Sequence, residues 1–522
     1  MSTVSPLWLL CFACPILFAQ SHSSPISPAD MSRIGTVDER FQSYNVEMLE
    51  VTGGRFWKPY SSAMNSSPAQ PKAQSEPTPA GMDPTLYEYR APIDLSNPRL
   101  RKLAAALGPA YVRVSGTWAN SVYFQNSDDP APSTAPAGFG SVLTRKEWKS
   151  VVDFAQAVNA EIVTSFATSQ GTRGDKGVWT PEQARQFLGF TKSAGGQIAA
   201  AEFMNEPTLA AMGGAPKGYD AAAYARDMRV FQPFIKQSSP EMELLGPGSV
   251  GEGSLALPNS TAIKTKDLLK ETGPVFDVFS YHVYAAVSQR CAKLGAAMQT
   301  TPAAALSKEW LSRSEQISSF YAQLRDQFEP GKPLWITETA DAACGGNPWA
   351  STFLDSFRYL VQHGSLAQHG VKVIMHNTLD ASDYGLLNEN TFAPRPNYWA
   401  ALLWRKLMGT TVLDPHISPP ENVYAYAHCL RDHSGGVALL VINADQHGAF
   451  NISVPSEAER YTVTAKQLQD NTVRLNGNTL TLDSKGELPQ LTGQRTPSGA
   501  VSFAAASITF LAIPKANNSK CQ

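Results

Sequence analysis

The sequence predicts a (β/α)8 (TIM) barrel followed by a C-terminal β-sandwich domain, and three observations lead to this α/β fold class. Between residues 40 and 410, eight short apolar runs alternate with eight longer stretches of helical character. No Gly-x-Gly-x-x-Gly follows any of these runs, which disfavours a doubly wound dinucleotide-binding sheet, the other fold with this alternation. Beyond Val412 the pattern changes to short β-rich runs separated by turns, without a long helix.

Each repeating unit begins with a short apolar run of strand character. Eight such strands are the number that closes a barrel. In chain order, the expected strands are Gln42–Leu49, Ala110–Val114, Glu161–Phe166, Ala201–Met204, Glu243–Leu245, Val278–Tyr284, Leu334–Thr337 and Lys372–Met375.

Each unit continues with a stretch of helical periodicity. Thr180-Pro181-Glu182 places a proline at the first helical position, where its missing N–H costs nothing. The expected helices are Pro98–Leu107, Thr144–Asn159, Thr180–Ala194, Asp220–Lys236, Ala262–Glu271, Glu309–Gln327, Ala350–His369 and Asn397–Met408. Residues 61–80, rich in Pro, Ser and Ala, are expected to form an exposed insertion between the first two units.

The region after the barrel, residues 411–522, is expected to be the β-sandwich. Its β-rich runs are Tyr424–His428, Gly436–Asn443, Tyr461–Ala465 and Val501–Ile513. The barrel is expected to span residues 40–410. We expect the β-sandwich to include one more strand, contributed by the chain before the barrel.

The first 22 residues are interpreted as a signal peptide. Leu7–Ala19 is an apolar run of the right length, followed by polar residues, and it is too short to span a bilayer. The usual basic residues at the start are missing, so an amphipathic or buried N-terminal helix is the alternative. No later segment resembles a membrane span. We therefore expect a secreted or periplasmic protein that does not bind a membrane.

Charge and cysteine content narrow the partners further. The 43 basic and 45 acidic residues give a net charge of −2, which excludes an electrostatically driven nucleic-acid binder. Without the signal peptide, four cysteines remain, and they permit two disulfides: Cys291, Cys344, Cys429 and Cys521. No Cys-x-x-Cys or His-x-x-x-His spacing among the remaining residues indicates a structural zinc site.

Polar residues follow the expected strands at the end where barrel active sites lie. The fourth strand leads into Asn205-Glu206-Pro207, the sixth ends in Tyr281-His282-Val283-Tyr284, and the seventh leads into Thr337-Glu338-Thr339. The pair Glu206 and Glu338 is therefore expected in one barrel mouth, and paired carboxylates hydrolyse glycosidic bonds. A separation of ~5–5.5 Å would give retention of the anomeric configuration, and ~6.5–9.5 Å would give inversion.

A bound cation is the alternative use of these side chains. Glu206, Glu338 and His282 carry oxygen and nitrogen ligands, but no characteristic spacing of Asp and His accompanies them. We therefore expect neither a metal nor another cofactor.

At these residues the sequence resembles the retaining (β/α)8 glycosidases with Asn-Glu on strand four and the nucleophile on strand seven. More narrowly, it resembles glycoside hydrolase family 79, the heparanases and β-glucuronidases. Residues 110–117 (AYVRVSGT) are similar to the family's strand-two stretch. Residues 383–388 (DYGLLN), 394–399 (PRPNYW) and 406–410 (KLMGT) are similar to its block after strand eight.

The resemblance implies the catalytic roles. Glu206 would be the general acid/base and Glu338 the nucleophile. Asn205 would bind the sugar 2-hydroxyl, a contact that tightens in the transition state. Tyr284 would donate to the nucleophile and hold it ionised.

The resemblance also implies how the substrate is held. Backbone N–H groups of Gly345 and Gly346, with the Tyr384 hydroxyl, would bind a substrate carboxylate. Three further residues are expected near the sugar: His282, Thr117 and Glu47. Glu47 is equally well interpreted as an ordinary strand-end carboxylate, and His282 as a packed histidine at the barrel mouth.

Cysteine positions add two expectations. Cys429 and Cys521 stand where the family has a disulfide within its β-sandwich, so the resemblance implies that pair. The family usually has a tyrosine just before Gly-Gly, whereas Ala343-Cys344 occupies this place here, which leaves the exact sugar specificity open. Cys344 can pair with Cys291, because both are expected on loops at the same barrel face, and the bridge would pin loops that frame the site.

The expected function is therefore a retaining glycoside hydrolase that removes β-linked glucuronic acid from glycans or glycosides. A heparanase-like endo-β-glucuronidase acting on glycosaminoglycans is the alternative, and it needs basic residues for sulfate groups. The sequence offers a modest supply near the mouth, Arg290 and Arg173, with Lys264 and Lys266 further off, which favours exo action. A non-catalytic glycan-binding relative is a minor alternative, because such proteins typically lose a carboxylate and both are present.

Overall fold

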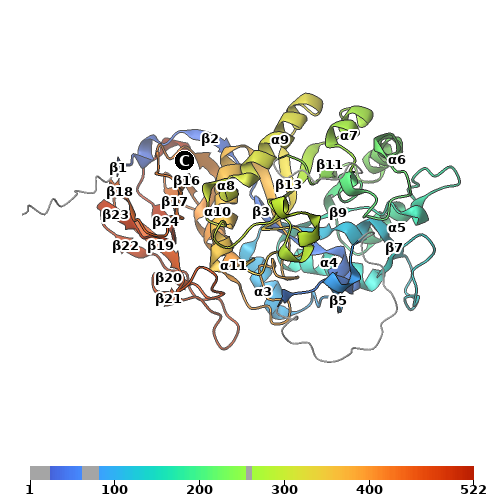
Figure 1. The fold of residues 1–522 in the computed structure, drawn as a ribbon, viewed down its shortest axis with the longest axis horizontal. Helices are drawn as coiled ribbons and strands as arrows, with labels where there is room; N and C mark the ends of the chain where they lie inside the picture. Colours follow the sequence, from blue (N-terminus) through green and yellow to red (C-terminus); the bar gives the residue numbers. More distant parts are fainter. Residues whose placement is uncertain (1–23, 61–81, 254–261) are drawn as a thin grey trace, which may run out of the picture.

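The structure is a computed structural model that describes residues 24–60, 82–253 and 262–522. The expected signal peptide (residues 1–22) and insertion (residues 61–80) lie outside the described residues. Figure 1 shows an elongated molecule with the barrel in one half and the C-terminal sheets in the other. No helix of the described part is long and apolar enough to cross a membrane.

Eight parallel strands close into a barrel, which confirms the predicted fold class. Neighbours in the chain are neighbours in the barrel, and the last strand pairs with the first. The strands are β3 (Gln42–Glu47), β6 (Ala110–Ser115), β9 (Ala160–Ser165), β10 (Ile198–Glu202), β11 (Glu243–Ser249), β12 (Val278–Tyr284), β13 (Leu334–Ala340) and β14 (Val371–His376).

Several strand ends differ from the predicted ones. Strand β10 ends at Glu202, because Phe203 and Met204 are buried in the core without joining the ladder. Strand β11 continues to Ser249, which pairs with β12; the sequence Gly246-Pro247-Gly248 hides this extension from a hydrophobicity pattern. After β3, Met48 and Leu49 are helical rather than extended, in α1 (Met48–Thr52).

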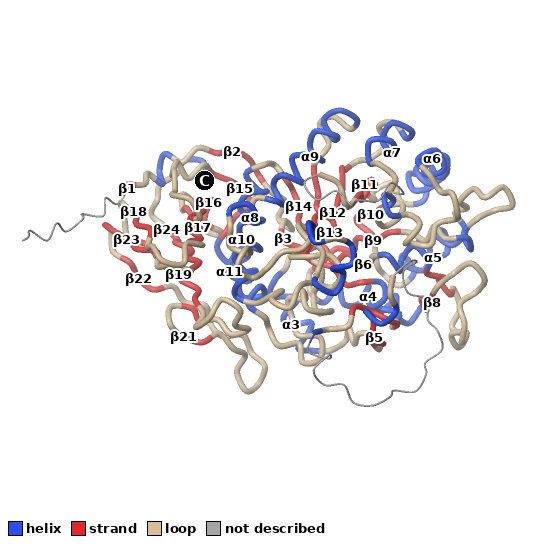
Figure 2. Tube along the Cα trace, in the orientation of Figure 1, coloured by secondary structure: helices blue, strands red, loops and turns tan. Residues whose placement is uncertain are grey.

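Helices surround the barrel (Figure 2). They are α3 (Pro98–Leu107), α4 (Arg145–Ala157), α5 (Glu182–Ser193), α6 (Ala221–Ser238), α7 (Thr265–Thr272), α9 (Arg313–Phe328), α10 (Phe353–Gln368) and α11 (Pro396–Leu407). The helix expected over residues 309–327 is divided at Ser312 into the short α8 (Lys308–Leu311) and α9. Pro181 precedes α5 instead of opening it.

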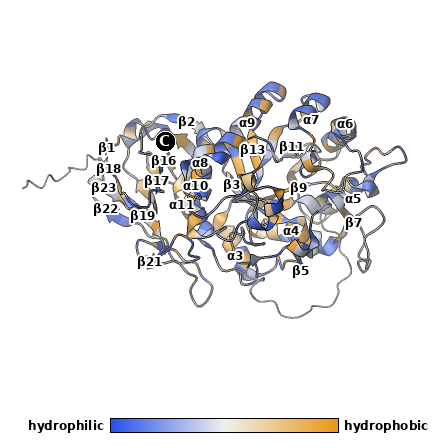
Figure 3. Cartoon of the chain, in the orientation of Figure 1, coloured by the Kyte–Doolittle hydropathy of each residue, from blue (hydrophilic) through white to orange (hydrophobic). Residues whose placement is uncertain are grey.

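Alternate residues of the barrel strands face two different cores, because side chains along a strand point to opposite sides. On β6, Val112 and Val114 pack toward the helices, while Tyr111 belongs to a separate cluster inside the barrel. That inner cluster contains Tyr111, Val163, Ala200, Leu245, Val278, Trp335, Val373 and Met375. Figure 3 shows hydrophobic barrel strands inside helices that alternate between hydrophobic and hydrophilic residues.

Two sheets form the C-terminal half. The larger has the order β2 (Arg33–Thr36), β15 (Met408–Leu413), β16 (Val423–Leu430), β17 (Val437–Asn443), β24 (Ser507–Ile513), β19 (Ala458–Thr464), β20 (Arg474–Leu475) and β21 (Asn478–Thr479), with β22 (Gln494–Thr496) beside β19. The smaller contains β1 (Ser24–Pro25), β18 (Phe450–Val454) and β23 (Gly499–Phe503). Apolar residues of both sheets form one core, including Ile452, Val501, Leu439 and Leu511.

Two features of these sheets bear on the predictions. Strand β2, from before the barrel, pairs with β15, and β1 pairs with β18. The run 501–513, expected as one strand, is divided between β23 and β24, which lie in different sheets. A turn separates them, where Ala506 has a φ of 48°.

Both expected disulfides are present. Cys429 on β16 is bonded to Cys521 near the C-terminus, inside the sandwich half. Cys291 is bonded to Cys344, which joins the loops that follow β12 and β13. Disulfides are typical of proteins that mature in an oxidising compartment.

Candidate active site

The site is built by the same inward-facing positions that form the apolar cluster, further along each strand. On β6 the inward residues are Tyr111 and then Arg113; on β10, Ala200 is followed by Glu202. On β12, Val278 is followed by Ser280, His282 and Tyr284. The inside of the barrel therefore changes from apolar to polar toward the carboxyl ends of the strands, where barrel active sites lie.

A cavity of about 720 Å³ opens at this end. Its volume is in the range of binding pockets for small ligands. Seven of the residues predicted to be catalytic or to bind substrate line it: Glu47, Thr117, Glu206, His282, Tyr284, Glu338 and Tyr384. A second cavity of about 280 Å³ lies beside the hairpin of β4 (Gly54–Trp57) and β5 (Tyr87–Arg90), and none of the predicted residues lines it.

Arg113 is the centre of the polar layer. Its side chain is 1% exposed, and Nη1 donates to Glu338 Oε2 at 3.0 Å while Nη2 donates to Glu202 Oε2 at 2.9 Å. Glu202 is fully buried and also accepts from the Ser280 and Thr337 hydroxyls. Burial alone would raise the pKa of Glu202, but the nearby Arg113 lowers it below the usual value. Arg113 is thus fixed by Glu202 and presents its other branch to Glu338.

Glu206 lies four residues beyond the end of β10, at the start of a short 3-10 turn (Pro207–Leu209). Its φ of 49° is in the left-handed region, an unfavourable conformation for a residue with a Cβ and a typical feature of functional sites. The carboxylate Oε1 lies 2.9 Å from His282 Nδ1. Burial, followed by the charge of Glu338, raises the pKa of Glu206, while the His282 hydrogen bond opposes this rise.

His282 connects this carboxyl group to Arg113. Arg113 Nη2, which can only donate, lies 3.3 Å from His282 Nε2. The neutral tautomer with the proton on Nδ1 satisfies both contacts, since Nδ1 then donates to Glu206. Burial lowers the pKa of His282, but Glu338 and the bond to Glu206 raise it above its usual value.

Glu338 is held from two sides. The Tyr284 hydroxyl donates to Oε1 at 2.6 Å, and Arg113 donates to Oε2. Burial and the negative charge of Glu338 raise the pKa of Tyr284 well above its ordinary value. The tyrosine therefore keeps its proton and remains a donor to the carboxylate.

Asn377, directly after β14, connects the remaining polar groups. Its Nδ2 lies 3.0 Å from Glu47 Oε1, 3.1 Å from the Tyr284 hydroxyl and 3.2 Å from the Tyr384 hydroxyl. Burial and the charges of Glu47 and Glu338 raise the pKa of Tyr384 well above its ordinary value. This amide ties the Glu47 carboxylate to Tyr284 and Tyr384, and all three of these side chains line the cavity.

Glu47 is a buried carboxylate at the end of β3. Its Oε2 has no hydrogen-bond partner among the described residues. Burial, followed by the charge of Glu338, raises its pKa well above the usual value. Space for this oxygen requires Gly116, because a Cβ there would lie 1.6 Å from Oε2.

Asn205 is fixed through both its backbone and its side chain. Its N–H donates to Asn120 Oδ1 at 2.8 Å, and its carbonyl accepts from Asn120 Nδ2 at 2.9 Å. Its own Oδ1 accepts from Arg113 Nη2 at 2.8 Å. Asn205 is buried and does not line the cavity; Thr117, at the start of the turn after β6, does.

Gly345 and Gly346 lie in the loop after β13; they are not in the cavity lining themselves, but the preceding residues Ala343 and Cys344 are. Their φ values of 79° and 84° favour glycine. A Cβ on Gly345 would lie 2.3 Å from Arg290 Nη1, and one on Gly346 would lie 3.1 Å from the Tyr384 Cβ. Within the described chain, neither glycine N–H has an acceptor.

A cation is the alternative occupant of the site. One ligand atom each of Glu206, His282 and Glu338 lie within 4.8 Å of one another, so these residues could hold a metal ion. The same atoms are already paired with each other and with Arg113, whose guanidinium is 3.0 Å from Glu338. The absence of a metal from the site therefore stays a prediction, and the hydrogen bonds and ion pairs among these side chains favour it.

Sequence reasoning assigned no role to Arg113, Glu202 or Asn377. An arginine within an otherwise apolar strand is the available signal for Arg113, because a buried charge needs a partner. Glu202 is the corresponding partner at the end of β10. The side-chain contacts of Asn377 depend on two other strands and on the loop after β14, and they left no comparable pattern.

Comparisons with known proteins agree with this fold. Residues 90–364 match the family described as Glycosyl hydrolase family 79, N-terminal domain. Heparanase-like protein 1 of Arabidopsis thaliana is 27% identical over 497 residues, covering 84% of this chain and 88% of that protein. Baicalin-beta-D-glucuronidase of Scutellaria baicalensis is 28% identical over 467 residues, covering 81% and 84%.

Among solved structures, a 4-O-alpha-L-rhamnosyl-beta-D-glucuronidase from Fusarium oxysporum superposes with a TM-score of 0.59. The identity is 13%, and the match covers 94% of this chain and 99% of that one, so it supports the fold alone. The family match extends over more than half of the chain, and a carboxylate pair stands at the mouth of the barrel. The chain is a glycoside hydrolase and belongs to glycosyl hydrolase family 79.

Proposed function

We propose that this protein is a retaining β-glucuronidase that removes β-linked glucuronic acid from the ends of small glycosides or glycans. The observation that carries the proposal is the approach of Glu206 and Glu338, of which one carboxylate oxygen each lie within 4.8 Å. Pairs about 5–5.5 Å apart act by double displacement, whereas inverting enzymes need ~6.5–9.5 Å to admit a water molecule.

Glu206 suits the role of the general acid/base. Its raised pKa, caused first by burial, keeps a proton available for the leaving group. Because Oε1 accepts from His282, this proton is carried on Oε2. In the first step the proton moves to the glycosidic oxygen; in the second, Glu206 removes a proton from the attacking water.

Glu338 suits the role of the nucleophile. Both of its oxygens accept hydrogen bonds, from Tyr284 and Arg113, which suits an ionised and oriented carboxylate. It attacks the anomeric carbon as the bond to the leaving group breaks, forming a covalent glycosyl ester. Water then displaces Glu338 from the same face that the leaving group left, so the configuration is retained.

Recognition of a uronate is supported by the unpaired N–H groups of Gly345 and Gly346 and by the Tyr384 hydroxyl. Backbone N–H groups bind anions without a salt bridge. In this proposal Asn205 binds the sugar 2-hydroxyl, while His282, Glu47 and Thr117 complete the wall around the sugar. The relative from Scutellaria baicalensis is named for hydrolysis of a glucuronide, which agrees with this assignment.

Exo action on a substrate with few sulfate groups is supported by the charges at the mouth. Arg173 is fully buried and paired with Asp227, and Arg290 is 6% exposed and paired with Asp383. Neither arginine is free to bind a sulfate. Among the described residues that line the cavity, Lys293 is the one lysine. Lys264 and Lys266 are exposed near the start of α7 and do not line the cavity, so the mouth offers few basic groups for sulfates.

The wall beside Glu206 has a similar implication for the leaving group, which must lie next to the acid. Leu209, Met212 and Val250 line the cavity there. This apolar lining suits an uncharged leaving group better than a sulfated sugar. Export through the N-terminal segment is part of the same proposal, and the two disulfides agree with it.

The proposal is tested by release of p-nitrophenol from its β-glucuronide, with the β-glucoside and β-galactoside as controls. We expect turnover on the glucuronide, with the β-anomer of glucuronic acid as the first product seen by NMR. Initial release of the α-anomer would contradict retention. Silence on all three, with shortening of heparan sulfate, would instead establish the heparanase-like endo activity.

A further inference from the structure

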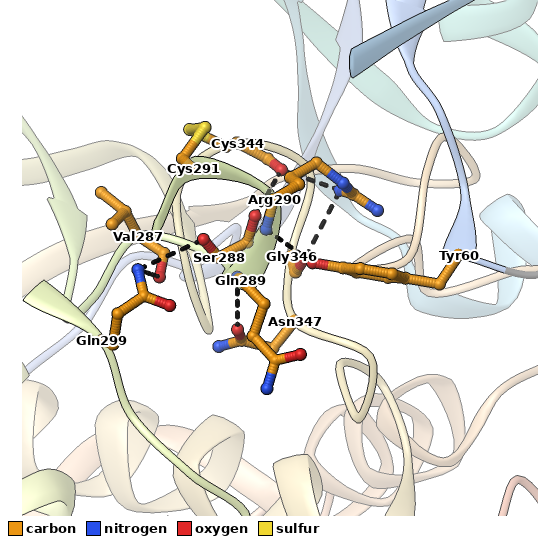
Figure 4. Close-up of a disulfide and its surroundings, with 10 residues drawn as sticks. All are labelled: Tyr60, Val287, Ser288, Gln289, Arg290, Cys291, Gln299, Cys344, Gly346 and Asn347. Atoms are coloured by element: carbon orange, nitrogen blue, oxygen red, sulfur yellow. Dashed lines mark hydrogen bonds between the residues drawn. A yellow bond between two sulfur atoms is a disulfide. The ribbon is translucent and has the colours of Figure 1, made fainter. Parts of the chain in front are cut away.

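The loop that follows the nucleophile strand is fastened to one neighbouring loop (Figure 4). Residues 343–347 form the first loop and residues 287–291, after β12, form the second. Ser288 N–H donates to the Ala343 carbonyl at 2.9 Å, and Gln289 N–H donates to Asn347 Oδ1 at 3.2 Å. The Cys291–Cys344 disulfide adds a covalent bond between the same loops.

The carbonyl groups of Cys344, Gly345 and Gly346 all accept hydrogen bonds, the first and third from the 287–291 loop and the second from the loop after β14. Cys344 O accepts from Arg290 Nη1 at 2.8 Å and from Ser288 Oγ at 2.9 Å. Gly346 O lies 3.4 Å from the same Nη1. Gly345 O accepts from the Ser382 hydroxyl at 2.9 Å.

The N–H groups of Gly345 and Gly346, unlike these carbonyl groups, have no hydrogen-bond partner among the described residues. Cys344, Gly345 and Gly346 all have positive φ values, 64°, 79° and 84°. Successive N–H groups of such a turn form concave sites for anions.

Arg290 is itself held in place and kept away from the ligand. Its Nη2 pairs with Asp383 at 2.5 Å, and its guanidinium lies over the Tyr60 ring, 4.1 Å from the centroid. Its backbone N–H donates to the Tyr60 hydroxyl at 3.1 Å. The side chain is 6% exposed and does not line the cavity, so it acts on a ligand only through the loop.

We propose that Arg290, together with the Cys291–Cys344 disulfide, is a positioning element that sets the carboxylate selectivity of this enzyme. It holds the Cys344 and Gly346 carbonyls and thereby orients the Gly345 and Gly346 N–H groups, which follow the cavity-lining residues Ala343 and Cys344, toward the substrate carboxylate. This inference rests on the proposed uronidase function and adds the residues that make the carboxylate site.

A planar fork is required for this role. One guanidinium nitrogen serves the two carbonyls while the other binds Asp383, and the flat face stacks on Tyr60. A lysine ammonium keeps the charge beside Asp383 but cannot reproduce the fork or the stacking. Arg290→Lys is therefore a variant that preserves the charge and removes the positioning.

The test compares Arg290→Lys and the double variant Cys291→Ser/Cys344→Ser with the wild type on p-nitrophenyl β-glucuronide and β-glucoside. We expect KM for the glucuronide to rise about tenfold in each, as for the loss of one good hydrogen bond to a charged group. The kcat should stay within about threefold, because uniform binding is lost. Any glucoside turnover should keep its kcat/KM.

The matched control is Cys429→Ser/Cys521→Ser, which removes the disulfide of the sandwich half. It should lower the melting temperature and leave KM for the glucuronide unchanged. The inference is overturned if both loop variants keep the wild-type KM, or if they lose glucuronide and glucoside activity in equal proportion. A wild type that cleaves no glucuronide would instead reject the proposed function, before any variant is compared.

Discussion

The inside of the barrel has two layers that the same strands build from opposite kinds of residue. Toward the amino ends of the strands, an apolar cluster surrounds Leu245 and Trp335. Toward the carboxyl ends, Arg113 is 1% exposed and bonded to Glu202 and Glu338. Both layers are buried. One strand can contribute to both: on β6, Tyr111 belongs to the apolar layer and Arg113, the next inward residue, belongs to the polar layer.

The difference separates stability from function. Apolar burial favours folding directly, at roughly 25 cal/mol per Å². A buried ion pair must first overcome the loss of hydration, and its net contribution to stability is often small. The polar layer is therefore best explained by the geometry it gives to Glu206 and Glu338. The following predictions test that division.

The largest expected effect is the loss of activity in Glu338→Gln. The amide cannot attack the anomeric carbon, and we expect kcat on p-nitrophenyl β-glucuronide to fall by about 10⁴-fold or more. Glutamine keeps the size of the side chain and can accept from Arg113, so the melting temperature should change little. Glu271→Gln, at an exposed position on α7, is the control. Wild-type activity in the Glu338 variant would remove the nucleophile from the proposal.

Replacement of Arg113 should damage both properties. Arg113→Met leaves Glu202 buried without its cation, and we expect a loss of about 3–5 kcal/mol in the free energy of unfolding. Glu338 loses a donor at the same time, so kcat should fall as well. Chemical denaturation and kinetics measure the two effects.

A double variant separates the two effects. Arg113→Met/Glu202→Met removes both charges of the buried pair, and most of the lost stability should return while the activity does not. If activity returned together with stability, Arg113 and Glu202 would have no catalytic role of their own.

The apolar layer should respond in the opposite way. Leu245 is fully buried, and Leu245→Ala should cost about 2–5 kcal/mol of unfolding free energy because it leaves a cavity. The kcat per folded molecule should remain within about twofold of wild type. A large fall in kcat, with the protein shown to be folded by circular dichroism, would show that the two layers are coupled.

Much of the fold could be predicted from the sequence because the barrel repeats one pattern eight times. All eight strands were expected close to where they lie, and the errors concern their ends. Phe203 and Met204 are apolar and were assigned to a strand, but only pairing with a neighbour decides where a ladder ends. Ala504–Ala506 interrupts a β-rich run because the turn there moves the chain to another sheet.

The site was predictable where chemistry is tied to a local motif and less so where it depends on contacts between strands. Glu206, Glu338 and Tyr284 stand at or just past strand ends, which a sequence pattern reveals. Arg113 was expected in the strand but given no role, since its partners lie 89 and 225 positions away in the chain. Arg173 was expected near the mouth, but its burial against Asp227 removes it as a ligand for sulfate.

The smallest predicted effect concerns pH and the hydrogen bond between His282 and Glu206. On the alkaline side, kcat/KM should fall as Glu206 loses the proton that the leaving group needs, at a pH above the ordinary range of a glutamate because burial raises its pKa. The His282 bond opposes that rise. In His282→Leu this opposition is gone, so the pKa of Glu206 should increase and the alkaline limb should move to higher pH. The pH profile of kcat/KM on the glucuronide measures the limb, and the Leu245→Ala variant, which leaves the polar layer intact, should keep the wild-type limb. A limb that stays in place or moves to lower pH in His282→Leu would mean that the general acid is not the carboxyl group bonded to His282. Glu206 would then lose its assigned role.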